Sequence, residues 1–267
     1  MTDSDMTPAD GRITRERLGR ALAIGIDRPK KLNGFSPKML VELAEAFTGL
    51  ERDEEVWVGV LFAHGRNFTA GLELDKVAPI MRERGTVFPA GAVDPLSLRP
   101  PIRTKPLVCA VQGICFTLGI ELMLAADIVV AADDCRFAQI EVARGIMPAG
   151  GATVRMVERA GWGNAQRYLL TGDAFGSSEA LRLGLVQEVV PAGCQTARAM
   201  EIAGVIAKQA PLAVRASLAS SRTAVDHGPH AAIRDFNAQL VRLMATEDAA
   251  EGVSSFIERR QAQFTGR

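Results

Sequence analysis

Cysteine and histidine are too few and too scattered in this sequence to form the patterns that mark metal or disulfide sites. The 267-residue chain has four cysteines and three histidines, and no two cysteines form a CxxC pair. These residues are Cys109, Cys115, Cys135 and Cys194, together with His64, His227 and His230. Because the histidines also lie far from the cysteines, we expect neither a zinc or other metal site nor a disulfide framework.

An excess of charge of either sign is also missing. Lys and Arg together number 31, as do Asp and Glu, so no global field attracts a polyanion or a membrane surface. Asp127 and Asp133 interrupt the longest apolar run before it reaches the roughly 18 residues that can span a bilayer. We therefore expect no nucleic-acid partner and no membrane partner.

Several common signatures are absent as well. The sequence has no GxSxG, no GxxxxGK[ST] and no GxGxxG, so it gives no support to a serine-hydrolase elbow, a P-loop or a dinucleotide-binding loop. Residues 1–12 are acidic and polar, without the basic start and apolar stretch of a secretory signal. We expect these residues to be a loose tail and the protein to be cytoplasmic.

The chain does contain enough apolar residues, 48%, for a large core in one α/β domain or one domain with a helical appendage. Ser36 and Pro37 are a typical N-cap and first residue of a helix. Strand patterns alternate with helical ones, which predicts βαβ crossovers and a parallel sheet. The predicted strands lie within residues 20–29, 56–65, 106–113 and 127–138.

Two regions depart from this alternation. Residues 85–101 are rich in glycine and proline, which predicts a mobile loop near a ligand site. From Gly161 onward the patterns are helical, so a helical C-terminal region is expected after the sheet.

Three loops that follow buried strands are candidates for the site, because ligands gather at the carboxyl ends of such strands. In the first loop, the turn at Gly71 leaves the amide of Leu72 free. The second runs into a helix start near Glu121, where unpaired amides and the helix dipole face outward. The third loop carries Glu141. Two convergent amides would suit an oxyanion hole, and the two glutamates would face one ligand.

Each of these features also has a simpler interpretation. A glutamate near a helix start, such as Glu121, is usually a capping residue or one that complements the helix dipole, and Glu141 could pair with Arg136 or Arg144. The residues alone therefore predict an α/β enzyme with an anion-stabilising cleft.

The ordered set of motifs resembles the crotonase (enoyl-CoA hydratase/isomerase) family over nearly the whole chain. In order, the motifs are RPKKLNGFS, FTAGLEL, VQGICFTLGIELMLAADI, FAQIEVARGIMPAGGATVRM, TGDAFGSSEALRLGLVQEVVP and TEDAAEGVSSFIERRQAQF. The resemblance implies an α/β fold, a crotonase-like spiral of ββα units over residues 13–200. A helical C-terminal region, residues 201–267, would build a homotrimer or a dimer of trimers. The ligand would be an acyl-CoA thioester, with no separate cofactor because CoA is part of the substrate.

The same motifs imply roles for individual residues. The amides of Leu72 and Leu118 would form the hole for the thioester oxygen of a 2-enoyl-CoA. Glu121 would activate water for addition at C3, and Glu141 would exchange the proton at C2. This combination predicts an enoyl-CoA hydratase-type lyase. The substrate-binding residues implied by the resemblance are Leu72, Glu73, Leu74 and Asp75 at the CoA-proximal site, Leu118, and Lys31 and Leu32 at the nucleotide end.

Departures from the family pattern leave two alternatives open. Leu118 stands where the family usually has glycine, Glu73 where it usually has aspartate, and Thr265 where a lysine often meets a CoA phosphate. One alternative is a double-bond isomerase in which Glu141 alone shuttles protons. The other is a non-catalytic acyl-CoA-binding or RNA-binding member, and the neutral charge balance disfavours the RNA-binding form.

Overall fold

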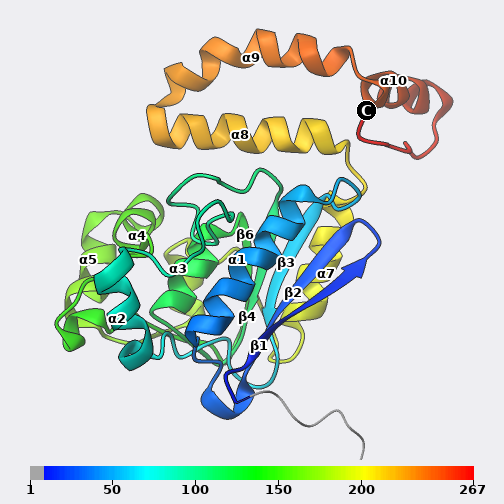
Figure 1. Cartoon of the computed structure of the whole chain (residues 1–267). Helices are drawn as coiled ribbons and strands as arrows, with labels where there is room; N and C mark the ends of the chain where they lie inside the picture. The colour runs from blue at the N-terminus through cyan, green and yellow to red at the C-terminus, as the bar shows by residue number, and fades with distance from the viewer. Residues whose placement is uncertain (1–8) are drawn as a thin grey trace, which may run out of the picture.

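A six-stranded sheet forms the centre of the body (Figure 1). The structure is a computed structural model that describes residues 9–267, so the tail predicted for residues 1–12 lies mostly outside the described residues. Strand β1 is antiparallel to β2, and all the other neighbouring pairs in this sheet are parallel. In spatial order the strands are β1 (Arg12–Leu18), β2 (Ala21–Asp27), β3 (Val58–Ala63), β4 (Leu107–Val111), β6 (Ile128–Ala132) and β9 (Glu188–Val190).

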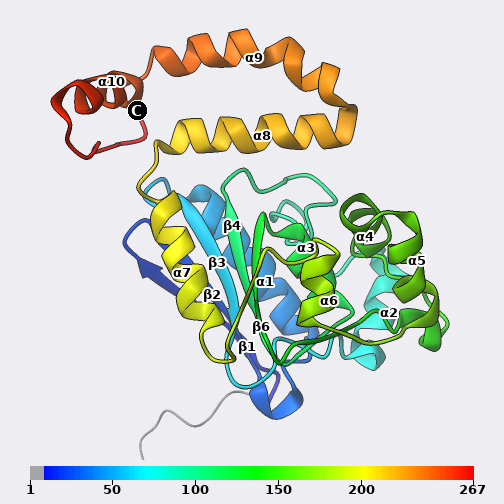
Figure 2. The same ribbon diagram turned by 180° about the vertical axis from the view of Figure 1, so that it is seen from behind.

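Helices cover both faces of this sheet, which explains why its central strands are apolar on both sides. Helix α7 (Gln195–Ile206) lies on one face, while α1 (Pro37–Arg52) and α3 (Leu118–Ala125) lie on the other (Figures 1 and 2). All five residues of β4 are buried. The predicted parallel sheet with helical crossovers is confirmed.

The start of α1 shows how the local sequence determines where a helix begins. Ser36 Oγ accepts a hydrogen bond from the amide of Met39 at 3.2 Å, and Pro37 is the first helical residue. Seven side chains of α1, among them Leu40, Leu43 and Phe47, are buried against the sheet. The predicted N-cap is confirmed.

The prediction of one strand over residues 127–138 is wrong. The structure has two strands there, β6 in the large sheet and β7 (Arg136–Ala138) in a three-stranded sheet with β5 (Ile114–Phe116) and β8 (Phe175–Gly176). A turn at Asp133 and Asp134 separates the strands, and its backbone is held because the Asp133 amide donates to the carbonyl of Val190 at 2.8 Å. The Asp134 carboxylate accepts from the amide of Gly113 at 3.2 Å.

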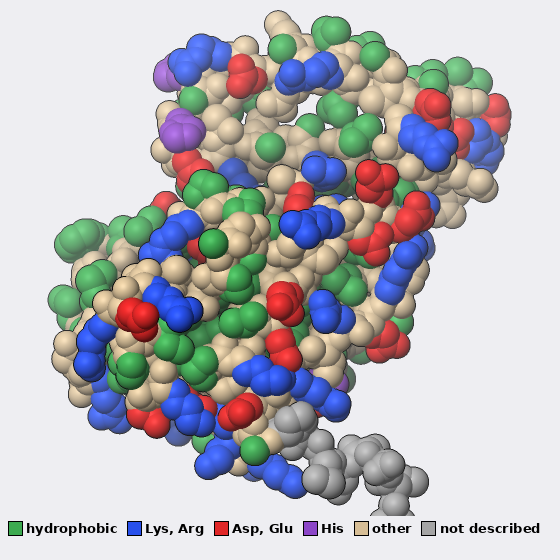
Figure 3. Space-filling model, viewed as in Figure 1, with side chains coloured by type: hydrophobic (Ala, Val, Ile, Leu, Met, Phe, Trp, Pro, Cys, Tyr) green, Lys and Arg blue, Asp and Glu red, His purple; other side chains and the backbone are tan. Residues whose placement is uncertain are grey.

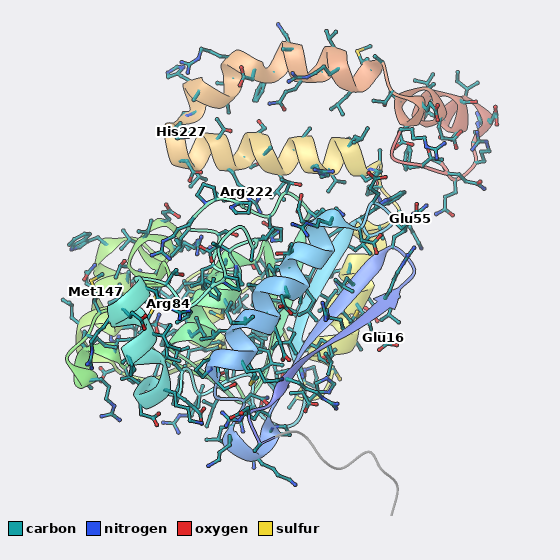
Figure 4. The ribbon with its side chains drawn as sticks, viewed as in Figure 1. Glu16, Glu55, Arg84, Met147, Arg222 and His227 are labelled. Atoms are coloured by element: carbon teal, nitrogen blue, oxygen red, sulfur yellow. The ribbon has the colours of Figure 1, made fainter. Side chains whose placement is uncertain are left out.

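The last three helices form a C-terminal arm that stands off the body (Figures 1 and 2). The arm comprises α8 (Pro211–His227), α9 (Pro229–Met244), which runs back beside α8, and α10 (Glu247–Glu258). Figure 4 shows Arg222 on the side of α8 that faces the body. Its guanidinium donates to Asp127 at 3.0 Å, and Asp127 also accepts from the fully buried Arg103 at 2.8 Å. This ion-paired group fastens the arm to the body just beyond the end of α3.

The remaining helices lie to one side of the sheet, around α3 (Figure 1). They are α2 (Leu74–Arg84), α4 (Ala152–Ala160), α5 (Trp162–Thr171) and α6 (Ser177–Arg182). Residues 85–101 contain no helix or strand, as expected, yet their inner part is buried at Val93, Asp94 and Leu96. The Asp94 carboxylate accepts the amides of Leu96, Leu98 and Arg99 at 2.8, 3.2 and 3.0 Å. This segment is therefore a folded wall rather than an open loop.

Candidate active site

A cavity of about 1250 Å³ opens beside α2 and α3 and contains both predicted glutamates. The predicted residues that line it are Leu72, Leu74, Asp75, Leu118, Glu121 and Glu141. Most of its other lining side chains are apolar, including Leu40, Val77, Met81, Phe88 and Leu96. Such a cavity, apolar with a few convergent polar groups, is typical of a site for a small organic ligand.

Backbone pairing brings the first two candidate loops together. The amide of Thr69 donates to the carbonyl of Ile114, and the amide of Phe116 donates to that of Thr69, both at 3.0 Å. Gly71 has φ +105°, and a Cβ built on it would lie 2.1 Å from Thr117 Oγ1. Only glycine allows this approach. Leu72 and Leu118 each follow one of these two residues, and both line the cavity.

The amides of Leu72 and Leu118 donate no hydrogen bond to any residue between 9 and 267. Leu118 is the first residue of α3, where amides have no partner within the helix and the helix dipole is positive. Thr117 before it has φ +50°, a conformation that costs a non-glycine residue of order 1–3 kcal/mol. Such strain is often found at functional sites, and here it lies at the residue that leads into α3.

The side chain of Leu118 is 5% exposed and packs within the main hydrophobic core while lining the cavity. The structure thus accommodates leucine where the family usually has glycine, and the leucine forms part of the cavity wall.

Glu121 is 5% exposed and points at the start of α4. Its Oε1 accepts a hydrogen bond from the amide of Gly150 at 2.5 Å, and the amide of Ala152 also faces the carboxylate. Burial raises the pKa of Glu121, while these two amides and the charge of Arg155 act in the opposite direction. The carboxylate is therefore buried but held at a helix N-terminus.

Glu141 is 7% exposed and begins the short 3-10 helix Glu141–Arg144. No described residue donates a hydrogen bond to its Oε2. Burial, with a smaller contribution from the charge of Glu121, raises the pKa of Glu141 to about 7. One cavity thus holds two carboxyl groups in different environments, one bonded by amides and one poised to exchange a proton near neutral pH.

Three predicted binding residues do not line the cavity. The carboxylate of Glu73 pairs with Arg28 and Lys76, both at 3.0 Å. Lys31 and Leu32 are exposed in a turn next to the first loop, where the carbonyl of Leu32 accepts from the amide of Ala70 at 2.9 Å. Glu73 is therefore part of an ion-pair network, and the turn borders the site from outside.

Sequence reasoning missed Arg155, on the first turns of α4. Its Nη2 donates to the carbonyls of Leu96 at 2.8 Å and Ser97 at 3.3 Å. These partners are more than 50 residues earlier in the chain, and no local pattern relates them to Arg155. Among the described residues, no group of three or more His, Cys, Asp or Glu side chains is placed to hold a metal ion.

The family model described as enoyl-CoA hydratase/isomerase matches residues 19–267. The chain belongs to this family. It is 31% identical over 252 residues to 2,3-dehydroadipyl-CoA hydratase from Escherichia coli strain K12, covering 94% of this chain and 97% of that protein.

Solved structures of the family have the same fold. A probable enoyl-CoA hydratase/isomerase from Mycobacterium abscessus superposes with a TM-score of 0.92 at 45% identity, covering 96% of this chain and 98% of the other. An enoyl-CoA hydratase from Mycobacterium tuberculosis H37Rv gives 0.86 at 34% identity, with 96% and 99% covered. The predictions of a crotonase-like α/β fold and of an enzyme of this family are confirmed. Over residues 9–267, no helix has the length and apolar character needed to cross a membrane.

Proposed function

We propose that the protein hydrates a 2-enoyl-CoA thioester to a 3-hydroxyacyl-CoA, as a carbon–oxygen lyase. The observation that carries the proposal is the pair of buried glutamates, Glu121 and Glu141, in one cavity with different hydrogen-bond environments. Family relatives named as enoyl-CoA hydratases support the same reaction.

Addition of water to the double bond places negative charge on the thioester oxygen. The free amides of Leu72 and Leu118 are the donors that would receive this oxygen. In comparable sites, losing one such donor raises the barrier by about 3–4 kcal/mol. Because the donors are backbone groups, leucine supplies them as well as glycine would.

The two glutamates would divide the proton transfers. The amides at the start of α4 favour the ionised form of Glu121, which can take a proton from the attacking water. With a pKa of about 7, Glu141 is protonated in a large fraction of molecules and can deliver a proton to C2. The sum is addition of H and OH across the double bond, with no redox change and no dissociable cofactor.

CoA would enter along the first loop. Leu72, Leu74 and Asp75 line the cavity next to the proposed oxyanion site. Lys31 and Leu32 lie in an exposed turn beside this loop. The cytoplasmic location and the absence of a nucleic-acid partner expected from the sequence remain part of this proposal.

The arm would assemble the protein into a homotrimer or a dimer of trimers. Large apolar side chains stand exposed along it, as Figure 3 shows for one face. They include Phe236 at 50%, Leu240 at 56%, Met244 at 70% and Phe256 at 84% exposed. An apolar surface of this extent on a protein surface typically marks an interface.

The test is loss of the conjugated absorbance of crotonyl-CoA and of longer enoyl-CoA thioesters. E121Q and E141Q should each reduce kcat by at least about 100-fold, as expected for loss of a general acid or base. E83Q, at an exposed position of α2, is the matched control. A loss of less than tenfold in E141Q would contradict the proposal.

The pKa of Glu141 near 7 also suits a single proton shuttle, which favours double-bond isomerisation as the second candidate. Retained conversion of a 3-enoyl-CoA to the conjugated isomer in E121A, together with lost hydration, would favour that reaction.

A further inference from the structure

Arg155 connects the wall of the cavity to the helix start that holds Glu121. Its Nη2 donates to the carbonyls of Leu96 and Ser97, and Leu96 lines the cavity. Arg155 is five residues after Gly150, whose amide donates to Glu121 just before the start of α4 at Ala152. Arg155 therefore contacts the cavity wall at Leu96 and belongs to the helix whose start lies against Glu121.

The other end of the guanidinium is buried without a partner. Arg155 Nη1 donates to no described acceptor, and it lies 2.7 Å from the position a Cβ would take on Gly151. No carboxylate forms a salt bridge with Arg155 within residues 9–267. A partly buried cation acts on nearby acids through a medium that screens it less than bulk water does.

Charged groups on four elements face Arg155. They are Glu158 and Arg159 on α4, Asp94 in the cavity wall, Glu121 on α3 and Arg222 on α8. Asp94 is engaged by the amides of its own turn.

The groups that face Glu121 are fewer. Gly150 and Gly151 lie between the side chains of Glu121 and Arg155, because a Cβ on Gly150 would lie 2.3 Å from Glu121 Oε2 and a Cβ on Gly151 would lie 2.7 Å from Arg155 Nη1. The charge of Arg155 lowers the pKa of Glu121, and Glu141 is the neighbouring acid. Glu121 is therefore the catalytic candidate that depends most on this arginine.

We propose that Arg155 is a positioning residue: its charge stabilises the carboxylate of Glu121, and its hydrogen bonds fix the Leu96 side of the cavity. The kinetic consequence rests on the proposed hydration, in which Glu121 acts as the base. The electrostatic consequence does not rest on the proposed hydration, because it concerns only the ionisation of Glu121. Removing the positive charge destabilises the carboxylate, so Glu121 should then hold its proton to higher pH.

The experiment compares R155Q, which loses the charge but keeps an amide donor, with R155K, which keeps the charge. Carbon-13 NMR of labelled glutamate carboxyls, with the Glu121 signal assigned from E121Q, reports its titration without any turnover. We expect Glu121 to titrate at higher pH in R155Q and as in the wild type in R155K. In kinetics, the acid limb of kcat/KM should move to higher pH in R155Q, so the loss of activity should be larger at pH 6 than at pH 9.

R159Q is the matched control, since Arg159 is a half-buried cation one turn further along α4. It donates to the carbonyls of Leu124 and Ala126, and its charge does not act on Glu121. The titration of Glu121 should stay unchanged in this variant. R155M removes the same charge and replaces R155Q if the glutamine variant folds poorly.

An unchanged Glu121 titration in a folded R155Q or R155M protein would overturn the inference, even if the wild type hydrates enoyl-CoA. A shifted titration in a protein that hydrates no enoyl-CoA would support the inference and contradict the proposed function instead.

Discussion

The amide of Gly150 lies 2.5 Å from Oε1 of Glu121, and a Cβ built on Gly150 would lie 2.3 Å from Oε2. Any side chain at position 150 must therefore displace the carboxylate. The absence of a side chain at Gly150 therefore leaves room for the carboxylate of Glu121.

G150A should accordingly lower kcat for hydration by about 10- to 100-fold, because a displacement near 1 Å is enough to cost that much in a positioned catalytic group. The measurement is steady-state hydration of crotonyl-CoA. G163A is the control, since Gly163 is a helical residue of α5 with nothing within 4 Å of its Cβ position. Equal losses in the two variants would show that Gly150 does not position Glu121.

The pH dependence of kcat/KM should be bell-shaped. Glu141 must be protonated to deliver a proton, so activity should fall as pH rises through about 7. Glu121 must be ionised to take one, so activity should also fall toward acid pH. A profile that keeps rising above pH 8 would contradict the assignment of Glu141 as the acid.

Glu141 should also affect stability in a pH-dependent way. Its pKa is raised in the folded state, so its contribution to stability is fully present below the ordinary value of 4.5 and is lost as pH rises toward about 7. E141Q avoids that loss and should be more stable than the wild type at pH 8, by about 1–2 kcal/mol after allowance for solvent screening. Denaturant unfolding at pH 4 and pH 8 tests this, and the gain should be absent at pH 4.

The oxyanion amide of Leu118 can be tested with a pair of substitutions. Leu118 is the first residue of α3, a position where proline is tolerated and removes the amide donor. L118P should lower kcat by about 10²- to 10³-fold, whereas L118G keeps the donor and should lose less. Both variants lose the same buried side chain, so stability falls in both. Equal kcat in the two proteins would exclude this amide from the oxyanion site.

The proposed assembly depends on the apolar face of α9. Charges introduced as L240E and M244E, where the side chains are 56% and 70% exposed, should yield smaller particles in light scattering. R242E changes a neighbouring charged position on the same helix and should leave the particle mass unchanged. A wild type that is monomeric at micromolar concentration would contradict the proposal.

The sequence allowed correct prediction of features that depend on local patterns. Ser36 and Pro37 marked the start of α1, and buried β-branched runs marked β3 and β4. Helix α2 was not predicted because Pro79 and several charges obscure its periodicity.

Long-range contacts were beyond the same reasoning. The pattern of residues 127–138 could not show that the turn at Asp133 moves the chain into another sheet. For the site, motif spacing and the family resemblance located Glu121 and Glu141. The ion pairs of Glu73 and the contacts of Arg155 join segments that are distant in the chain, so only the fold reveals them.

Helix α3 has eight residues, and both of its ends are engaged. At its start lie the Leu118 amide and Glu121, while at its end the carbonyls of Leu124 and Ala125 accept from Arg159 and Arg103. Inserting or deleting one residue would rotate the rest of the helix by about 100°. Either Glu121 would turn away from the cavity, or the hydrogen bonds from the two arginines to the carbonyls would be lost. A change in the number of residues should therefore be tolerated better in the segments that wall the cavity around α3 than within α3 itself.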